Sequence, residues 1–432
     1  MDQLTKFLVY NQTPSSQNNI NYDKTRPPKS ENGKKKNTTG DSDKRLLLLS
    51  PDLGRRNEVL YARNRLLPGS KPAVAGGKPI TEELATELRI VAFGTASCPP
   101  RGEWIRTPLV MRPADQPLGY GLAAPRNGTR SLLSGLQALI IKWLLFDSRP
   151  VTKDNKSREP PDSYLRPSED RQEEALWRAC SEVIWRCGGG FNAQGEATAT
   201  VALPTGNTYV QHSAQYYQDG ITEKLQLFEF KSLEDVQICL KRYIYLFQSE
   251  EGAGALLLLY AVMLSRGCEN VKKDLDGKLS HLVSAQVEGS LNVTTLLLTG
   301  RATPYLHNGV QYVGDEDHYA MPQFGVLARS PVGLLVWYGV DENVATSFNK
   351  QYPGSRLKTP ALPIWVTMIL LYEGILYCVK LPKKLRKLGA LKSHIYKYFC
   401  SRNSTVIHSK QNPFVLRSFI RPSVSFAVSF SQ

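Results

Sequence analysis

The chain has 432 residues and is 41% hydrophobic, which is enough apolar material for a sizeable core in one large domain or a few smaller ones. A net charge of +15 would suit a nucleic-acid groove, but eleven Lys and Arg against one acid follow Thr367 and carry +10 of it. The remaining +5 gives no reason to infer nucleic acid as a partner. The basic tail leaves attachment to an anionic membrane surface as an alternative.

The seven cysteines include no Cys-x-x-Cys pair, and the six histidines include no His-x-x-x-His pair. An odd number of cysteines without such spacing is typical of reduced thiols in the cytosol or nucleus, so we expect an intracellular protein. Since no motif for a structural zinc or for metal catalysis is present, we predict neither a metal site nor a cofactor. Residues 1–22 lack the apolar run of a secretory signal.

Residues 1–80 are predicted to form a disordered, basic N-terminal region. The stretch 11–43 is polar and contains the run Lys34–Lys36, and prolines keep the residues after it irregular. Within this region, Leu46–Leu49 is a short apolar run that is a candidate to dock on the domain or on a partner. We expect ordered structure to begin near Thr81.

Helices dominate the middle of the chain, because apolar residues recur there at three- and four-residue spacing. The predicted helix at 255–264 is apolar on all sides, which indicates a buried core helix too short to span a bilayer. Glycines follow three of the helices and are expected to end them. The predicted helices cover 129–146, 168–187 with Ser168 as a cap, 232–247, 255–264 and 293–299.

Strands gather toward the end of the chain. Alternating or continuous apolar runs predict them at 197–203, 225–230, 332–340 and 363–369. The long apolar run that ends at Val379 contains Glu373, whose burial in a membrane would cost on the order of 2.5 kcal/mol. We therefore expect two buried strands joined near 372–374, and an α+β fold with a helical core.

Two local features could suggest a functional site, a glycine-rich run and a histidine among acids, but each has a simpler structural explanation. The run Cys187–Phe191, CGGGF, follows a helix, whereas a phosphate-binding loop follows a strand, so we interpret the glycines as a helix stop and Cys187 as core. His318 lies in the acidic run GDEDHYA and is interpreted as a surface loop histidine rather than a pH sensor.

Four blocks in this order point to a known family: Gly121–Phe146, Gly254–Gly267, Leu296–Ala302 and Thr359–Val366. Together they resemble the MINDY family of cysteine deubiquitinases, and most closely the branch that contains its fourth numbered member and an inactive sister protein. The resemblance implies a papain-like domain, here over 81–367, and ubiquitin or polyubiquitin as a partner. Beyond it, 368–432 is a divergent basic tail, as alternative splicing would produce.

The resemblance also implies where a catalytic site would lie. In active members a turn of the approximate form Gly-Leu-Val-Gln-x-x-Gly-Gly-Pro-Cys-Gly supplies an oxyanion-binding glutamine and a nucleophilic cysteine at a helix start. In this chain Ala124 matches the glutamine, Arg130 the cysteine and Tyr372 the general-base histidine. Arginine has no nucleophilic lone pair at neutral pH and alanine has no side-chain donor, so we predict that none of the three is catalytic.

The leading interpretation is an inactive deubiquitinase homologue that binds polyubiquitin or a partner without cleaving it. Two alternatives stay open. One is an active cysteine deubiquitinase with a displaced nucleophile, for which Cys98 in the run FGTASCPP is the loop candidate. The other is an adaptor that binds anionic surfaces through the basic tail.

Overall fold

A computed structural model describes much of the chain, and all of the described residues belong to one compact unit, Glu58–Gln432. The described residues are 71–100, 102–116, 118–123, 128–146, 166–191, 196–250, 252–314, 321–337, 352–369, 374–379 and 396–399. The segment predicted to be disordered up to residue 70, and most of the basic tail, lie outside them. No described helix is long and apolar enough to cross a membrane.

The five predicted helices are confirmed, with ends shifted by a few residues. The helices are α1 (Glu82–Phe93), α2 (Arg130–Phe146), α3 (Glu169–Cys187), α4 (Leu233–Gln248), α5 (Gly254–Arg266), α6 (Cys268–Leu275), α7 (Leu291–Thr299) and α8 (Ser355–Lys358), with 3₁₀ turns η1 (Gly102–Ile105) and η3 (Thr222–Lys224). The sequence reasoning missed α1, α6 and α8. In α1 the cause is Arg89, a fully buried charge that interrupts the apolar face.

Helix ends follow local capping chemistry. The Thr81 hydroxyl accepts a hydrogen bond from the Leu84 N–H at 3.3 Å and starts α1, and the Ser232 hydroxyl accepts one from the Asp235 N–H and starts α4. The prediction that Ser168 caps α3 is only half right. Ser168 occupies the cap position in an extended conformation, but its side chain makes no capping hydrogen bond. Gly188, Gly267 and Gly300 follow α3, α5 and α7, as predicted.

The strands form three sheets. They are β1 (Lys78–Pro79), β2 (Ala199–Pro204), β3 (Leu225–Phe230), β4 (Val310–Val313), β5 (Met321–Phe324), β6 (Gly333–Trp337), β7 (Ile364–Ile369), β8 (Gly374–Val379) and β9 (Tyr396–Phe399). The strand orders are β1-β3-β2, β4-β5 and β6-β7-β8-β9. Only β6 and β7 pair in parallel among these described strands.

The predicted pair of joined strands at 363–379 is confirmed as the antiparallel pair β7–β8, in which Ile369 lies opposite Gly374. The predicted domain boundary at 367 falls inside β7, and β8 and β9 pair beyond it. The sheet therefore continues into the region that we assigned to the tail.

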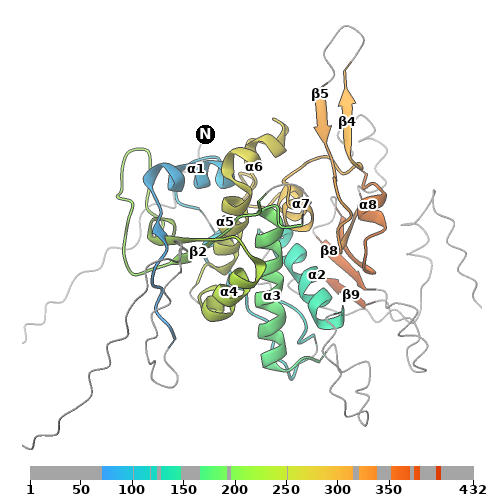
Figure 1. Cartoon of the computed structure of the whole chain (residues 1–432), viewed down its shortest axis with the longest axis horizontal. Coiled ribbons are helices and arrows are strands. Elements are labelled where there is room, and N and C mark those ends of the chain that lie inside the picture. Colours follow the sequence, from blue (N-terminus) through green and yellow to red (C-terminus); the bar gives the residue numbers. More distant parts are fainter. Residues whose placement is uncertain are drawn as a thin grey trace, which may run out of the picture. The chain divides into compact units, whose positions relative to one another are not determined.

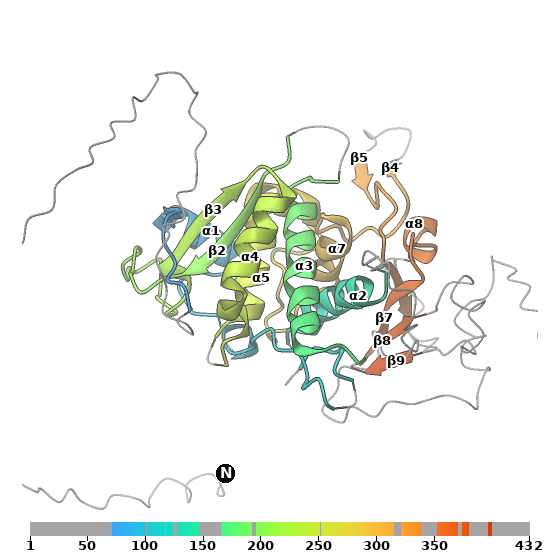
Figure 2. The ribbon, with the colours of Figure 1, turned by 60° about the horizontal axis from the view of Figure 1, so that its bottom comes forward.

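Helix α3 lies at the centre of the helical core and packs against α2, α4, α5 and α7 (Figures 1 and 2). Helix α5 contacts β2 on its other side, and α2 contacts β7 and β8. Every residue of α5 from Gly254 to Met263 is buried, which confirms the predicted core helix. The fold is thus α+β, with α2 held between the helical core and the last sheet.

Candidate functional site

The turn before α2 is held by hydrogen bonds from distant parts of the chain. Gln137 in α2 accepts from the Leu122 N–H at 2.6 Å and donates to the Tyr120 carbonyl at 2.8 Å. The Gly128 N–H donates to a Glu103 carboxylate oxygen at 2.6 Å. Because both sides of the turn are bonded to other elements, the chain enters α2 at a defined position.

The start of α7 lies directly against the start of α2. The Gly289 N–H donates to the Gly128 carbonyl at 2.9 Å, and the Thr294 hydroxyl donates to the Ser131 carbonyl at 2.8 Å. A Cβ atom at Gly289 would come within 2.1 Å of the Ser131 hydroxyl oxygen, so only glycine allows this close approach. Farther along the two helices, a Cβ atom at Gly135 would lie 3.1 Å from the Leu297 side chain, so the blocks Gly121–Phe146 and Leu296–Ala302 are in contact.

Arg130 is the first residue of α2, and its side chain is half-buried. The N-terminus of a helix favours negative charge, so it would stabilise a thiolate and disfavours a cation. A helix start thus favours a thiolate, whereas arginine, the residue at this helix start, cannot act as a nucleophile. Ala124 and Tyr372 lie outside the described residues, so their roles remain predictions.

The buried cysteines are poor nucleophiles. Burial raises the pKa of the Cys187, Cys239 and Cys268 thiols to about 12, and it also raises that of Cys180. Each of these thiols stays protonated near neutral pH. The interpretation of Cys187 as core is confirmed, since it is 2% exposed. Cys98, in contrast to these four, is exposed.

The structure brings a histidine into the neighbourhood of the Cys98 loop, which no sequence spacing revealed. Arg89 donates hydrogen bonds to the carbonyls of both Cys98 and Tyr217, and the Tyr217 N–H donates to the Ala96 carbonyl at 3.0 Å. The exposed His212 ring lies 4.8 Å from the Tyr217 ring, centroid to centroid. Within the described residues, no histidine is hydrogen-bonded to a cysteine. His318 lies outside them.

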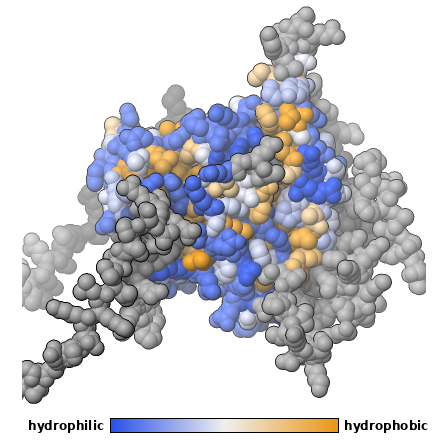
Figure 3. Space-filling model, viewed as in Figure 1, coloured by the Kyte–Doolittle hydropathy of each residue, from blue (hydrophilic) through white to orange (hydrophobic). Residues whose placement is uncertain are grey.

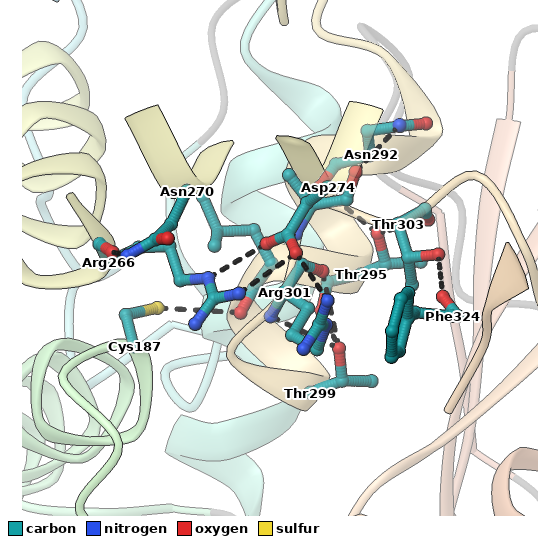
Figure 4. Close-up of polar contacts among 12 residues, drawn as sticks. Cys187, Arg266, Asn270, Asp274, Asn292, Thr295, Thr299, Arg301, Thr303 and Phe324 are labelled. Atoms are coloured by element: carbon teal, nitrogen blue, oxygen red, sulfur yellow. Dashed lines mark hydrogen bonds and ion pairs between the residues drawn. The ribbon is translucent and has the colours of Figure 1, made fainter. Parts of the chain in front are cut away.

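A buried charge cluster joins α5 and α6 to the block Leu296–Ala302 (Figure 4). The fully buried Asp274 carboxylate accepts from the Arg266 guanidinium at 2.8 and 2.9 Å and from Arg301 at 2.8 Å. It also accepts from the Ala302 N–H at 3.2 Å. Burial lowers the pKa of Arg301, and Asp274 opposes this shift. Sequence reasoning missed the cluster because its members belong to separate elements.

Among the described residues, no group of three or more histidine, cysteine or acidic side chains is arranged so that it could hold a metal ion.

Comparison with known proteins places these features in context. The conserved domain of deubiquitinating enzyme MINDY-3/4 matches residues 89–404, which includes β8 and β9. The chain is 30% identical over 314 residues to "Probable ubiquitin carboxyl-terminal hydrolase MINDY-4" of Xenopus tropicalis, covering 73% of this chain and 39% of the relative. For the Mus musculus protein of that name the identity is 29% over 303 residues, with 70% and 38% covered.

A more distant similarity is to ubiquitin carboxyl-terminal hydrolase MINDY-3 of Homo sapiens, at 24% identity over 307 residues, with 66% of this chain and 63% of the relative covered. The chain thus spans about two-fifths of the length of the MINDY-4 relatives. No solved structure matches it.

Proposed function

Because the chain belongs to the MINDY-3/4 family of deubiquitinating enzymes, we propose that it binds ubiquitin or polyubiquitin without cleaving it. The observation that carries this proposal is Arg130 at the first position of α2, where the family resemblance places the nucleophile. The packing of α2 against α3 and α7 supports a retained scaffold. An arginine at its helix start supports the loss of the reaction.

The purified protein is expected to hydrolyse no ubiquitin chain, because the matched nucleophile, base and oxyanion-binding positions hold residues that lack those functions. The measurement is incubation with chains of each linkage and with ubiquitin that carries a C-terminal thiol-reactive group. Cys98→Ala is the informative variant, since Cys98 is exposed whereas Cys180, Cys187, Cys239 and Cys268 are buried. Cleavage or labelling that disappears in Cys98→Ala would replace this proposal with the displaced-nucleophile alternative.

Arg130→Ala is expected to leave the affinity for ubiquitin unchanged or to improve it. Its guanidinium Nε atom is shielded from solvent and the side chain is half-buried, which favours a side chain packed against the domain over one that reaches out for a ligand. The measurement is titration with intact ubiquitin and with ubiquitin that lacks its last two glycines.

If Arg130 instead captured the terminal carboxylate of ubiquitin, Arg130→Ala would weaken binding of intact ubiquitin only. A charged hydrogen bond of that kind contributes about 1.5 to 3 kcal/mol, or at least tenfold in affinity. Selective loss of that size would contradict the expectation that the Arg130 side chain packs against the domain.

A further inference from the structure

The β4–β5 hairpin has one face made only of apolar side chains. Val310 lies opposite Phe324 and Tyr312 lies opposite Pro322, and residues two apart along a strand point to the same face. These four residues are called the hairpin face below. The opposite face carries Gln311, Gln323, Val313 and Met321, so it is mixed.

The hairpin face is unusually exposed for an apolar surface. Tyr312 is 72% exposed, Phe324 42% and Val310 38%. Figure 1 shows the hairpin extending away from the helices, and Figure 3 shows apolar residues gathered on it. A two-stranded hairpin is marginally stable alone and gains from a covering surface. Contiguous exposed apolar residues of this kind mark an interaction site.

The base of the hairpin is fixed, so the face is presented at a defined place. The Gly309 N–H donates to the Val326 carbonyl at 2.9 Å, and the Val326 N–H donates to the His307 carbonyl at 2.8 Å. The Thr303 hydroxyl donates to the Phe324 carbonyl at 2.6 Å, and the Arg301 guanidinium lies 5.2 Å from the Phe324 ring centre. The Asp274 cluster therefore supports the hairpin through Arg301.

The base of the hairpin and the start of α2 both lie near helix α7. The N-terminal half of α7 contacts the start of α2 through Thr294, and the chain reaches the hairpin base at Thr303 soon after α7 ends. After α7 the chain folds back along it, because the Asn292 side-chain amide donates to the Ala302 carbonyl at 2.9 Å and the Thr295 hydroxyl donates to the Thr303 carbonyl at 3.0 Å. The start of α2 and the hairpin base thus both lie beside the N-terminal half of α7, so one folded protein can contact the hairpin while its extended tail reaches the start of α2.

We propose that the hairpin face is a docking surface for the folded body of ubiquitin, while the tail of that ubiquitin approaches the start of α2. This inference rests on the proposed function. Its second support is charge, since the seven residues that join the strands, GDEDHYA, include three acids and no lysine or arginine. An apolar face with acidic charge in the same hairpin suits a partner whose apolar patch is bordered by basic side chains, as in ubiquitin.

The test compares the two faces of one hairpin by titrating ubiquitin against the full chain. The double variant Val310→Ser/Tyr312→Ser is expected to weaken binding about tenfold or more, because exposed aromatic anchors dominate interface energies. The matched control, Val313→Ser/Met321→Ser, removes exposed apolar residues from the opposite face and is expected to change affinity less than about twofold. Thermal unfolding of both variants checks that the fold survives.

The outcomes separate the two proposals. If the unaltered chain binds neither ubiquitin nor polyubiquitin, the proposed function fails and this docking surface fails with it. If it binds and the hairpin-face variant binds equally well, or if both double variants lose affinity alike, only the docking surface is overturned. A self-associating chain whose dimer is lost in Val310→Ser/Tyr312→Ser, with ubiquitin binding intact, would assign the face to a second copy and also overturn it.

Discussion

Asp274→Ala is expected to lower the free energy of unfolding by about 3 to 5 kcal/mol, the range found when one partner of a buried ion pair is removed. The Asp274 carboxylate is fully buried and is shared by Arg266, Arg301 and the Ala302 N–H. Without it, two partly buried guanidinium groups face each other with no anion between them. The Arg266 and Arg301 side chains are 20% and 24% exposed, so water relieves part of this cost and the lower end of the range is the more appropriate estimate.

The measurement is denaturant unfolding of the purified variant and of a matched control. Glu196→Ala removes an exposed ion pair, in which Lys231 lies 3.4 Å away and both side chains are more than three-quarters exposed. Such pairs contribute about 0 to 1 kcal/mol, so this control is expected to be nearly neutral. Equal small effects of the two substitutions would contradict the view that Asp274 supports the hairpin base.

Restoring the three lost roles together, by Ala124→Gln/Arg130→Cys/Tyr372→His, is expected to produce a protein that reacts with ubiquitin carrying a thiol-reactive C-terminus. Arg130→Cys alone is expected to give no detectable chain hydrolysis. A thiol at the start of α2 gains from the helix N-terminus, but without a base and an oxyanion donor it lacks the groups that act with it. Catalytic residues of this kind work as a unit, and losing a member costs on the order of 10³-fold or more.

The measurement is labelling and chain cleavage by the single and triple variants, with Ala124→Gln/Tyr372→His as the thiol-free control at position 130. Turnover by Arg130→Cys alone would show that the base is supplied from a position other than 372. Lack of labelling by a folded triple variant would show that the scaffold around the start of α2 no longer supports the reaction.

The sequence by itself determined the elements whose signals are local. The apolar spacing of 129–146 predicted α2, and the hydroxyl and acid at Ser232 and Asp235 predicted the start of α4, because a helix places its side chains and caps within a few residues of each other. The absence of a nucleophile at Arg130 was equally readable, because the guanidinium group of arginine stays protonated in any surroundings within a protein.

Only the tertiary structure decided which distant residues meet. The shared burial of Asp274 with Arg266 and Arg301, the approach of His212 to the Cys98 loop through Tyr217, and the exposed hairpin face all depend on how separate elements pack. An acid or an arginine in a helix has the same sequence signal whether it faces water or a buried partner. Its burial, and with it the cost of losing that partner, is determined by the elements packed against it.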